Sequence, residues 1–337
     1  MLKNWEMDSL SSGSNKKKIA SLQNYILNGI SSDGIENVQS NSLMEEIENI
    51  SVFHPWFIKE HLIYALRTFA EGLSRIDIDF MQSQGQLQGK KIGFWYRPLS
   101  PVEGLPHFLA ALQRGANCEI ITDRYNRRLL EFFFRVFKSY LSIPEESYSF
   151  QESSISRDAS AIVVIGEKPL PVQLGYISKH PIFLETAERF GNELIITGSE
   201  TQQNLDRMAI ELGMYFGRSI YNKSVLRVPE KYKFEKLTEA LKKFEHYSNH
   251  SRYFNHYEYR KAGFIVGRKA FTDTGTFLLT RAADTVRYIS VIQYFVNKDE
   301  IFESDIADVE LSNADSFEMR MFKSLPEFCK FISTLSN

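Results

Sequence analysis

The sequence contains few cysteines, no long apolar run and no large excess of charge of either sign. Its 337 residues include only two cysteines, Cys118 and Cys329, which are too few for a disulfide framework and suit a reducing cytoplasm. No apolar stretch is long enough to span a bilayer, and the N-terminus lacks the basic-then-apolar order of a signal peptide. The net charge of −2 does not indicate nucleic-acid binding. We therefore expect a soluble, cytoplasmic globular protein.

Common signatures of cofactor binding and catalysis are absent too. The sequence has no G-x-G-x-x-G and no G-x-x-x-x-G-K-[ST] motif. Gly166 ends a strand-like run and stands where a phosphate could bind, but a strand-ending turn explains this glycine better. Cys118 opens a buried strand and Cys329 lies in an amphipathic helix, so both cysteines are interpreted as packing residues rather than nucleophiles.

Histidines are concentrated in one block, which contains His246, His250 and His256. His246 and His250 are four residues apart, so on a helix they could hold a metal from one face. No H-E-x-x-H pattern or cysteine pair completes a ligand set, and asparagine, serine and tyrosine surround them. We predict no metal site here and interpret the block as a polar, aromatic loop that packs on a sheet.

The remaining chain alternates between strand-like and helix-like segments. Such alternation predicts an α/β protein with a parallel sheet covered on both faces. Residues 1–18 are predicted to be loosely ordered, with a short helix at 16–29, helical periodicity from Leu43 to Ile50, and its continuation over 54–73 with Pro55 near the helix start. Ser199 or Thr201 is the predicted N-cap of a helix that ends at Gly217. The predicted strands are 90–96, 118–123, 160–166, 192–198, 224–229, 275–281 and 288–296, and the other predicted helices are 101–115, 126–141 and 232–247.

One predicted helix is strongly basic and aromatic. Its cations are Arg124, Arg127, Arg128, Arg135 and Lys138, interleaved with four phenylalanines. A helix that meets a membrane surface, nucleic acid or an acidic partner would have this composition. An amphipathic core helix with a solvated basic face has the same spacing and is favoured, because the chain as a whole is not basic.

The order of segments resembles the LuxC-type acyl-CoA reductases of the aldehyde dehydrogenase superfamily. The resemblance runs over most of the chain and depends on "FHPWF", on "KKIGFWYRPLSPVEGLPHFLAAL" followed by "RGANCEIITD", and on "ITGSETQQNLDRMAIELGMYFGRSIYNKSVLRVPEKYKFEKL". The block "NHSRYFNHYEYRKA" followed by "GTFLLT" adds to it. It implies two α/β lobes, a Rossmann-like cofactor lobe and a catalytic lobe, with the active site between them.

On this basis we divide the chain into four parts. Residues 1–42 form a flexible N-terminal segment with a short helix, and residues 43–200 form the nucleotide-binding-like lobe. Residues 201–310 form the catalytic-like lobe, and residues 311–337 form a C-terminal helix.

The resemblance also implies a cysteine nucleophile, a hydrogen-bond donor to the oxyanion and residues that bind NADPH. By alignment on "YFG" and "RVP", the cysteine position is Ile220, which cannot form a thioester. The family's oxyanion asparagine corresponds to Leu99, and its cofactor-binding lysine corresponds to Ile121. Gly217, Asn222 and Ser224 do fit the family pattern, and Gly166 and Thr122 are the candidate cofactor-binding residues.

We therefore expect an acyl-CoA reductase homologue that has lost catalysis and serves as a binding or assembly subunit. It would act beside an active reductase or an acyl-activating enzyme, could hold an acyl chain, and needs no cofactor. The alternative is an active NADPH-dependent reductase with an unconventional site, for example with Ser219 as nucleophile, although no base for that serine is evident in the sequence. An adaptor that binds an acidic partner through the basic helix is a third possibility.

Overall fold

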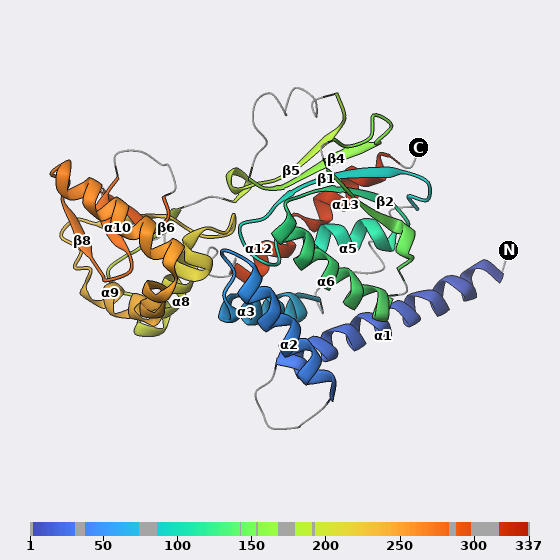
Figure 1. The fold of residues 1–337 in the computed structure, drawn as a ribbon, viewed down its shortest axis with the longest axis horizontal. Helices are drawn as coiled ribbons and strands as arrows, with labels where there is room; N and C mark the ends of the chain where they lie inside the picture. The colour runs from blue at the N-terminus through green and yellow to red at the C-terminus, as the bar shows by residue number, and fades with distance from the viewer. Residues whose placement is uncertain are drawn as a thin grey trace. The chain divides into compact units, whose positions relative to one another are not determined.

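The computed structural model describes residues 3–30, 38–73, 86–141, 143–152, 154–167, 179–190, 193–282, 288–297 and 317–335. The chain forms two compact units, one from Met1–Thr186 with Met321–Asn337 and the other from Ala187–Arg320 (Figure 1). The two predicted α/β lobes are therefore present. The predicted boundary at residue 200 lies inside the second unit, because β6 (Glu193–Ile195) pairs with a strand of the second sheet.

The first unit is built on an all-parallel sheet with the strand order β3-β2-β1-β4-β5. This order is the one found in the first five strands of a Rossmann fold, so the Rossmann-like lobe is confirmed. The sequence did not predict β3 and β5, which have four residues each. The strands are β1 (Lys91–Arg97), β2 (Asn117–Ile121), β3 (Tyr148–Gln151), β4 (Ala161–Gly166) and β5 (Ile182–Glu185).

Three helices cover one face of this sheet: α5 (Leu105–Gln113), α6 (Arg124–Leu141) and α13 (Leu325–Ser333). Aromatic side chains fill the space between strands and helices. The Phe94 ring of β1 lies 4.1 Å from Phe108 of α5, and Phe183 of β5 lies 5.2 Å from Phe328 of α13, measured between ring centroids. Each such ring contributes about 1.5–3 kcal/mol on burial. The C-terminal segment is thus an integral part of the first unit.

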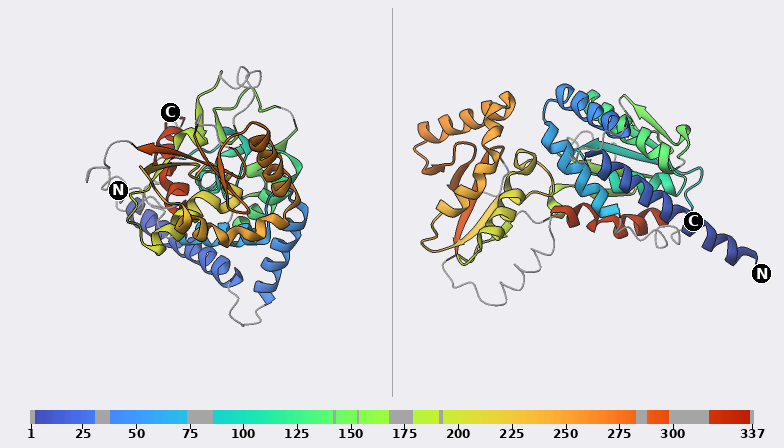
Figure 2. Two further views of the ribbon diagram at one scale, coloured as in Figure 1. Left: turned by 90° about the vertical axis from the view of Figure 1, so that its left-hand side faces the viewer. Right: turned by 90° about the horizontal axis from the view of Figure 1, so that it is seen from below.

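The N-terminal helices α1 (Lys3–Ile30), α2 (Val38–Phe53) and α3 (Lys59–Leu73) pack against α6 and one another (Figure 1 and Figure 2). Two predictions were wrong here. The residues predicted to be loosely ordered are helical from Lys3 onward, and α1 is held on α6 by Tyr25, whose ring lies 5.0 Å from Tyr140. The helix expected to start near Pro55 begins only at Lys59, because His54 Nδ1 accepts the Phe57 amide hydrogen at 3.1 Å in the segment between α2 and α3.

The second unit has a mixed sheet with the order β6-β7-β10-β9-β8, in which β8 is antiparallel to β9 and the other pairs are parallel. The expectation of a purely parallel sheet is therefore wrong for β8, a three-residue strand that the sequence did not predict. Thr201 is confirmed as the α8 N-cap, since its hydroxyl accepts the Asn204 amide hydrogen. The further elements are β7 (Val225–Pro229), β8 (Phe271–Asp273), β9 (Leu278–Arg281), β10 (Val291–Asn297), α8 (Gln202–Gly213), α9 (Glu235–Leu241) and α10 (Ser251–Val266).

The histidine block forms a helix rather than the predicted loop. A 3-10 segment, Lys242–Asn249, leads into α10, and His250 caps α10 by accepting the Tyr253 amide hydrogen at its Nδ1, 3.2 Å away. Tyr257 packs on the sheet with Leu278 and Val291. No group of three or more His, Cys, Asp or Glu side chains within the described ranges could hold a metal ion.

Candidate functional site

The loop that contains Ile220 begins with a left-handed turn. Tyr215, Phe216 and Gly217 have φ values of 55°, 62° and 68°, so α8 ends at Gly213 and not at the predicted Gly217. A non-glycine residue in this conformation costs about 1–3 kcal/mol and persists only where the surroundings enforce it. Here the surroundings are aromatic: the Phe216 ring lies 4.3 Å from Tyr247 and 4.8 Å from Tyr253.

Ile220 follows this turn and is fully buried. Ile220 lies inside a backbone turn, in which the Asn222 amide donates to the Ser219 carbonyl at 3.0 Å. The Ser219 hydroxyl oxygen accepts the Tyr221 amide hydrogen at 3.3 Å, and Ser219 is also fully buried. The centre of this loop therefore presents an aliphatic side chain beside a hydroxyl that takes part in holding the turn.

Asn222 and Arg320 attach the loop to α8. Asn222 Nδ2 donates to the Glu211 carbonyl at 2.8 Å, and the Lys223 amide donates to the same oxygen at 3.0 Å. Arg320 forms an ion pair with the Glu211 carboxylate and donates through Nε to the Tyr221 carbonyl at 3.1 Å. Hydrogen bonds in which the donor or the acceptor is charged, as in these Arg320 contacts, are stronger than those between neutral groups. Asn222 is thus placed as a structural residue of the loop.

In the first unit, the loop after β1 is organised by a buried carboxylate. Glu103 is fully buried, accepts the Leu99 amide hydrogen at 2.7 Å and accepts the Ser100 hydroxyl at 3.0 Å. Burial raises the pKa of Tyr96 well above its usual value, and the negative charges of Glu103 and Asp123 add to this effect. Leu99 itself is half-buried and carries no side-chain donor. Its amide is already used within the loop.

Ile121 lies at the carboxyl end of β2 in an apolar cluster with Trp95, Ile162 and Val164. It is 5% exposed, so it is a core residue of the sheet face opposite the helices. Thr122 follows it, and its hydroxyl oxygen is buried with no hydrogen-bond partner among the described residues. Ile121, the position of the family's lysine, and Thr122, the candidate cofactor-binding residue, therefore lie at and just beyond the carboxyl end of β2.

Gly166, at the end of β4, has a structural reason to be glycine. Its φ is +84°, and a Cβ atom would lie 1.9 Å from the Arg97 carbonyl oxygen of β1. No other side chain fits this close approach of two strand ends. The prediction that Gly166 belongs to a strand-ending turn agrees with this geometry.

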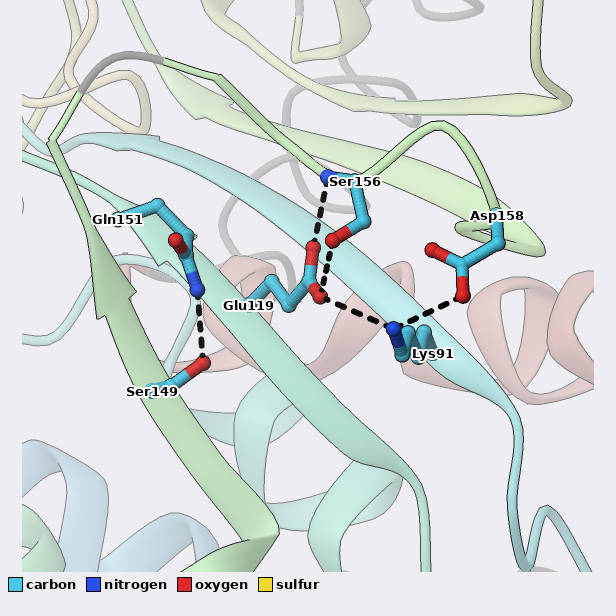
Figure 3. A network of polar contacts seen from close by, with 6 residues as sticks. All are labelled: Lys91, Glu119, Ser149, Gln151, Ser156 and Asp158. Atoms are coloured by element: carbon cyan, nitrogen blue, oxygen red, sulfur yellow. Dashed lines mark hydrogen bonds and ion pairs between the residues drawn. The ribbon is translucent and has the colours of Figure 1, made fainter.

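A strap, residues 154–160, crosses the sheet face opposite the helices and joins β3 to β4 (Figure 3). Glu119 of β2 holds it by accepting the Ser156 amide hydrogen at 2.8 Å and the Ser156 hydroxyl at 2.6 Å. Lys91 of β1 pairs with Asp158 at 2.8 Å and lies 3.7 Å from Glu119. In a doubly wound fold a helix usually makes such a crossover.

The strap also explains a glycine in the middle of β1. Ile155 of the strap presses on Gly93, where a Cβ atom would lie 2.5 Å from the Ile155 side chain. Ile155 packs against the cluster that contains Ile121. The strap was not predicted from the sequence, and the only signal for it is the short spacing between β3 and β4.

Asp123 closes the carboxyl edge of β2. It accepts the amide hydrogens of Tyr125 and Asn126 at the start of α6 and pairs with Arg97 at 3.2 Å. Burial alone would raise the Asp123 pKa, but the hydrogen bonds from Asn126 and Tyr125 and the Arg97 charge outweigh it and lower the pKa. The Asp123 carboxylate is thus used to cap the start of α6 and to pair with Arg97.

Both cysteines and the phenylalanines of the basic helix are buried, which agrees with the packing roles predicted for them. Burial raises the pKa of the Cys118 thiol far above its usual range and that of Cys329 to about 11, so neither is a ready thiolate. In α6 the phenylalanines are buried, and the cations contact groups of the same unit. Arg127 pairs with Glu131, Arg135 with Glu46, and Lys138 with Glu145.

The chain shares the aldehyde dehydrogenase fold. It matches aldehyde dehydrogenase 21 from Physcomitrella patens in complex with succinate with a TM-score of 0.56 at 10% identity, over 87% of this chain and 70% of that one. A NAD-dependent benzaldehyde dehydrogenase from Corynebacterium glutamicum gives 0.54 at 10%, over 91% and 82%. An oxidoreductase from Marinobacter aquaeolei gives 0.57 at 10%, over 87% and 70%.

At these identities the likeness concerns the fold. No family model matches the sequence, and no curated protein matches it. No helix in the described part of the chain has both the length and the apolarity to cross a membrane.

The predicted site residues fall into two groups, each within one unit. Leu99, Ile121, Thr122 and Gly166 lie on the first unit, at the carboxyl ends of its strands or in the loop after β1. The other group, Gly217, Ser219, Ile220 and Asn222, occupies one loop between α8 and β7.

Proposed function

We propose that this chain is a homologue of acyl-CoA reductases that has lost catalysis and acts as a binding or assembly subunit. The observation that carries the proposal is the burial of Ile220 at the centre of an intact loop. A fully buried aliphatic residue, with its neighbour Ser219 already used to hold the turn, provides neither a nucleophile nor an oxyanion donor.

The first unit supports the same proposal, because its residues do not favour binding of the cofactor NADPH. The lysine that the resemblance implies is Ile121, a member of an apolar cluster. The strap lies on that cluster and is held by Glu119, so the sheet face next to Ile121 is covered by the protein's own chain. We therefore expect no NADPH binding.

The role that remains is to bind rather than to react. Leu99 and Ile121 in the first unit, and Ile220 in the second, are apolar where the resemblance implies polar groups, so each unit offers apolar rather than charged contacts to a ligand. An active reductase or an acyl-activating enzyme is the partner that the resemblance implies. A hetero-oligomer with such an enzyme is our proposed assembly.

Incubation with acyl-CoA and NADPH tests the loss of catalysis. We expect neither NADPH oxidation nor an acyl adduct by mass spectrometry from the natural protein. Ser219→Ala serves as the control, because it removes the hydroxyl that the alternative requires. Turnover by the natural protein, or an adduct on Ser219 that Ser219→Ala removes, would establish the alternative, an active reductase with an unconventional site.

Binding measurements separate the other parts of the proposal. Calorimetry with NADPH should show no binding, and heat of binding without turnover would contradict only the argument from Ile121 and the strap. Mixing with an acyl-CoA reductase that retains its cysteine should give a stable complex on size exclusion. Failure to associate with either a reductase or an acyl-activating enzyme would reject the assembly role.

A further inference from the structure

The exposed apolar side chains of the second unit are concentrated on one helix. Among the described residues, six large hydrophobic side chains are exposed, and four of them lie on α10. Ile265 and Val266, the last two residues of this helix, are 60% and 83% exposed, and Tyr259 is 75% exposed. Large exposed apolar patches are characteristic of interaction sites, so this helix is a candidate for one.

These side chains lie on α10, the orange helix in Figure 1, where Tyr259 and Val266 share one side and Phe254 and Ile265 share a second side about 120° around the helix. Tyr259, Ala262 and Val266 are spaced three and four residues apart, so they follow one stripe along the helix. The opposite side is anchored, since Tyr253 and Tyr257 are buried, and the Tyr253 hydroxyl donates to the Thr276 carbonyl at 2.7 Å. The apolar stripe is therefore held outward by a fixed inner face.

The segment that carries the stripe also has an excess of basic side chains. The α10–β8 corner, defined as residues 251–273, has five cationic side chains and two carboxylates, Glu258 and Asp273. Asp273 is paired with Lys261 at 2.7 Å, whereas the described residues provide no ion-pair partner for Arg252 or Arg268. The cations are Arg252, Arg260, Lys261, Arg268 and Lys269.

This corner differs from the basic helix α6 of the first unit. The α6 cations Arg127, Arg135 and Lys138 each pair with a glutamate, and the α6 phenylalanines are buried. At the α10–β8 corner the aliphatic residues Ile265 and Val266 are exposed and directly precede the turn that contains Arg268. Exposed aliphatic residues beside cations are the combination by which a protein binds at a lipid headgroup layer.

We propose that the α10–β8 corner binds the surface of an anionic lipid bilayer. Ile265 and Val266 enter the headgroup region, and Arg252 and Arg268 contact lipid phosphates. The excess of positive charge favours this occupant over a second copy of the chain, because a two-fold interface would bring like charges together. The proposal is independent of any acyl-CoA chemistry.

Vesicle flotation tests the proposal with the full chain. We expect binding to vesicles of phosphatidylcholine mixed with phosphatidylglycerol, little binding to phosphatidylcholine alone, and release at high salt. Each basic residue near an anionic surface contributes about fivefold to partitioning. The double variant Arg268→Glu with Lys269→Glu should therefore lose at least about 20-fold. Ile265→Ser with Val266→Ser should reduce binding as well.

Matched controls come from the same chain. Arg207→Glu with Lys236→Glu reverses two exposed cations on α8 and α9, and Val52→Ser removes an aliphatic residue that is 89% exposed on α2. Both should leave vesicle binding unchanged. Equal losses in the control and corner variants, or no binding of the natural protein to anionic vesicles, would overturn the proposal.

A label provides a second measurement that needs no loss of binding. Because Cys118 and Cys329 are buried, a Val266→Cys variant can be labelled selectively with an environment-sensitive fluorophore. Its emission should shift toward that of an apolar medium on addition of anionic vesicles, whereas a label at Val52→Cys should not respond. A natural protein that self-associates, becomes monomeric on Ile265→Ser with Val266→Ser and does not respond to vesicles would assign the corner to a second copy instead.

Discussion

The Nε2 atom of His107 lies 3.1 Å from the hydroxyl oxygen of Ser324, although 217 positions separate the two residues. His107 is fully buried in α5 and Ser324 directly precedes α13, so the contact joins the returning end of the chain to the first unit. A Glu185 carboxylate oxygen is 3.8 Å from the same nitrogen, and the Phe183 and Phe328 rings flank the imidazole.

Ser324→Ala should destabilise the first unit by about 1–3 kcal/mol, because it removes one hydrogen-bond partner of a buried imidazole. Urea denaturation measures the loss. Ser139→Ala is the control, since that exposed hydroxyl bonds only to the Arg135 carbonyl within α6. Similar effects of the two substitutions would show that the long-range contact contributes nothing.

Gly166→Ala should cost more than about 2 kcal/mol, because it adds a Cβ atom 1.9 Å from a carbonyl oxygen and requires a positive φ. Gly89→Ala isolates the second effect, since Gly89 has φ +79° and no atom within 4 Å of the added Cβ. This control should cost about 1 kcal/mol. Thermal unfolding of both variants checks the difference, and equal costs would contradict the close approach.

Phe216→Gly should be more stable than Phe216→Ala by about 1 kcal/mol, because only alanine retains the strain of the left-handed conformation. Both variants lose the packing against Tyr247 and Tyr253. Phe244 provides the control: it is also buried but lies in the 3-10 segment without a positive φ, so there alanine should be the more stable replacement. The same order of stability at both positions would rule out strain at Phe216.

Glu119→Gln should loosen the strap, because an amide offers one acceptor where the carboxylate offers two and it carries no charge for Lys91. Hydrogen exchange should show a faster amide at Ser156. Ser149→Ala, on the neighbouring strand, removes only a contact with Gln151 and should leave that exchange rate unchanged. Unaltered protection in Glu119→Gln would mean that apolar packing alone holds the strap.

Acid should remove the contribution of Asp123. Its pKa is lower in the folded protein than in the unfolded chain, so this stabilisation is fully present above about pH 4 and is lost as the pH falls through the folded value. Asp123→Asn should therefore lower stability at neutral pH and have progressively less effect in acid. A constant difference across this pH range would exclude the carboxylate as the cause.

The regular elements with strong patterns were predictable. The apolar strands β1, β2 and β4 and the amphipathic helix α6 follow directly from residue periodicity. The strands β3, β5 and β8 were missed because they have only three or four residues, several of them polar. Pro55 was placed in a helix because nothing local indicates that the His54 ring accepts amide hydrogens there.

The residues proposed for the candidate site can be named from the sequence, but their geometry cannot. An isoleucine at position 220 is visible in the sequence, but its burial is not, and the left-handed turn before it packs through Phe216 on Tyr253 of α10. The strap is held by Glu119 and Lys91 of β2 and β1, which local periodicity cannot connect to Ser156 or Asp158. Long-range contacts of this kind have no signature in one sequence.

The first unit is assembled from both ends of the polypeptide, with α13 completing the helical side of its sheet. A ribosome releases α13 only after the whole of the second unit has been synthesised. The second unit can therefore fold during translation. Until α13 is made, the apolar surface around Phe183 that it covers stays exposed. Termination directly after Arg320 would yield a chain with a complete second unit and a first unit whose apolar surface is exposed and prone to aggregation.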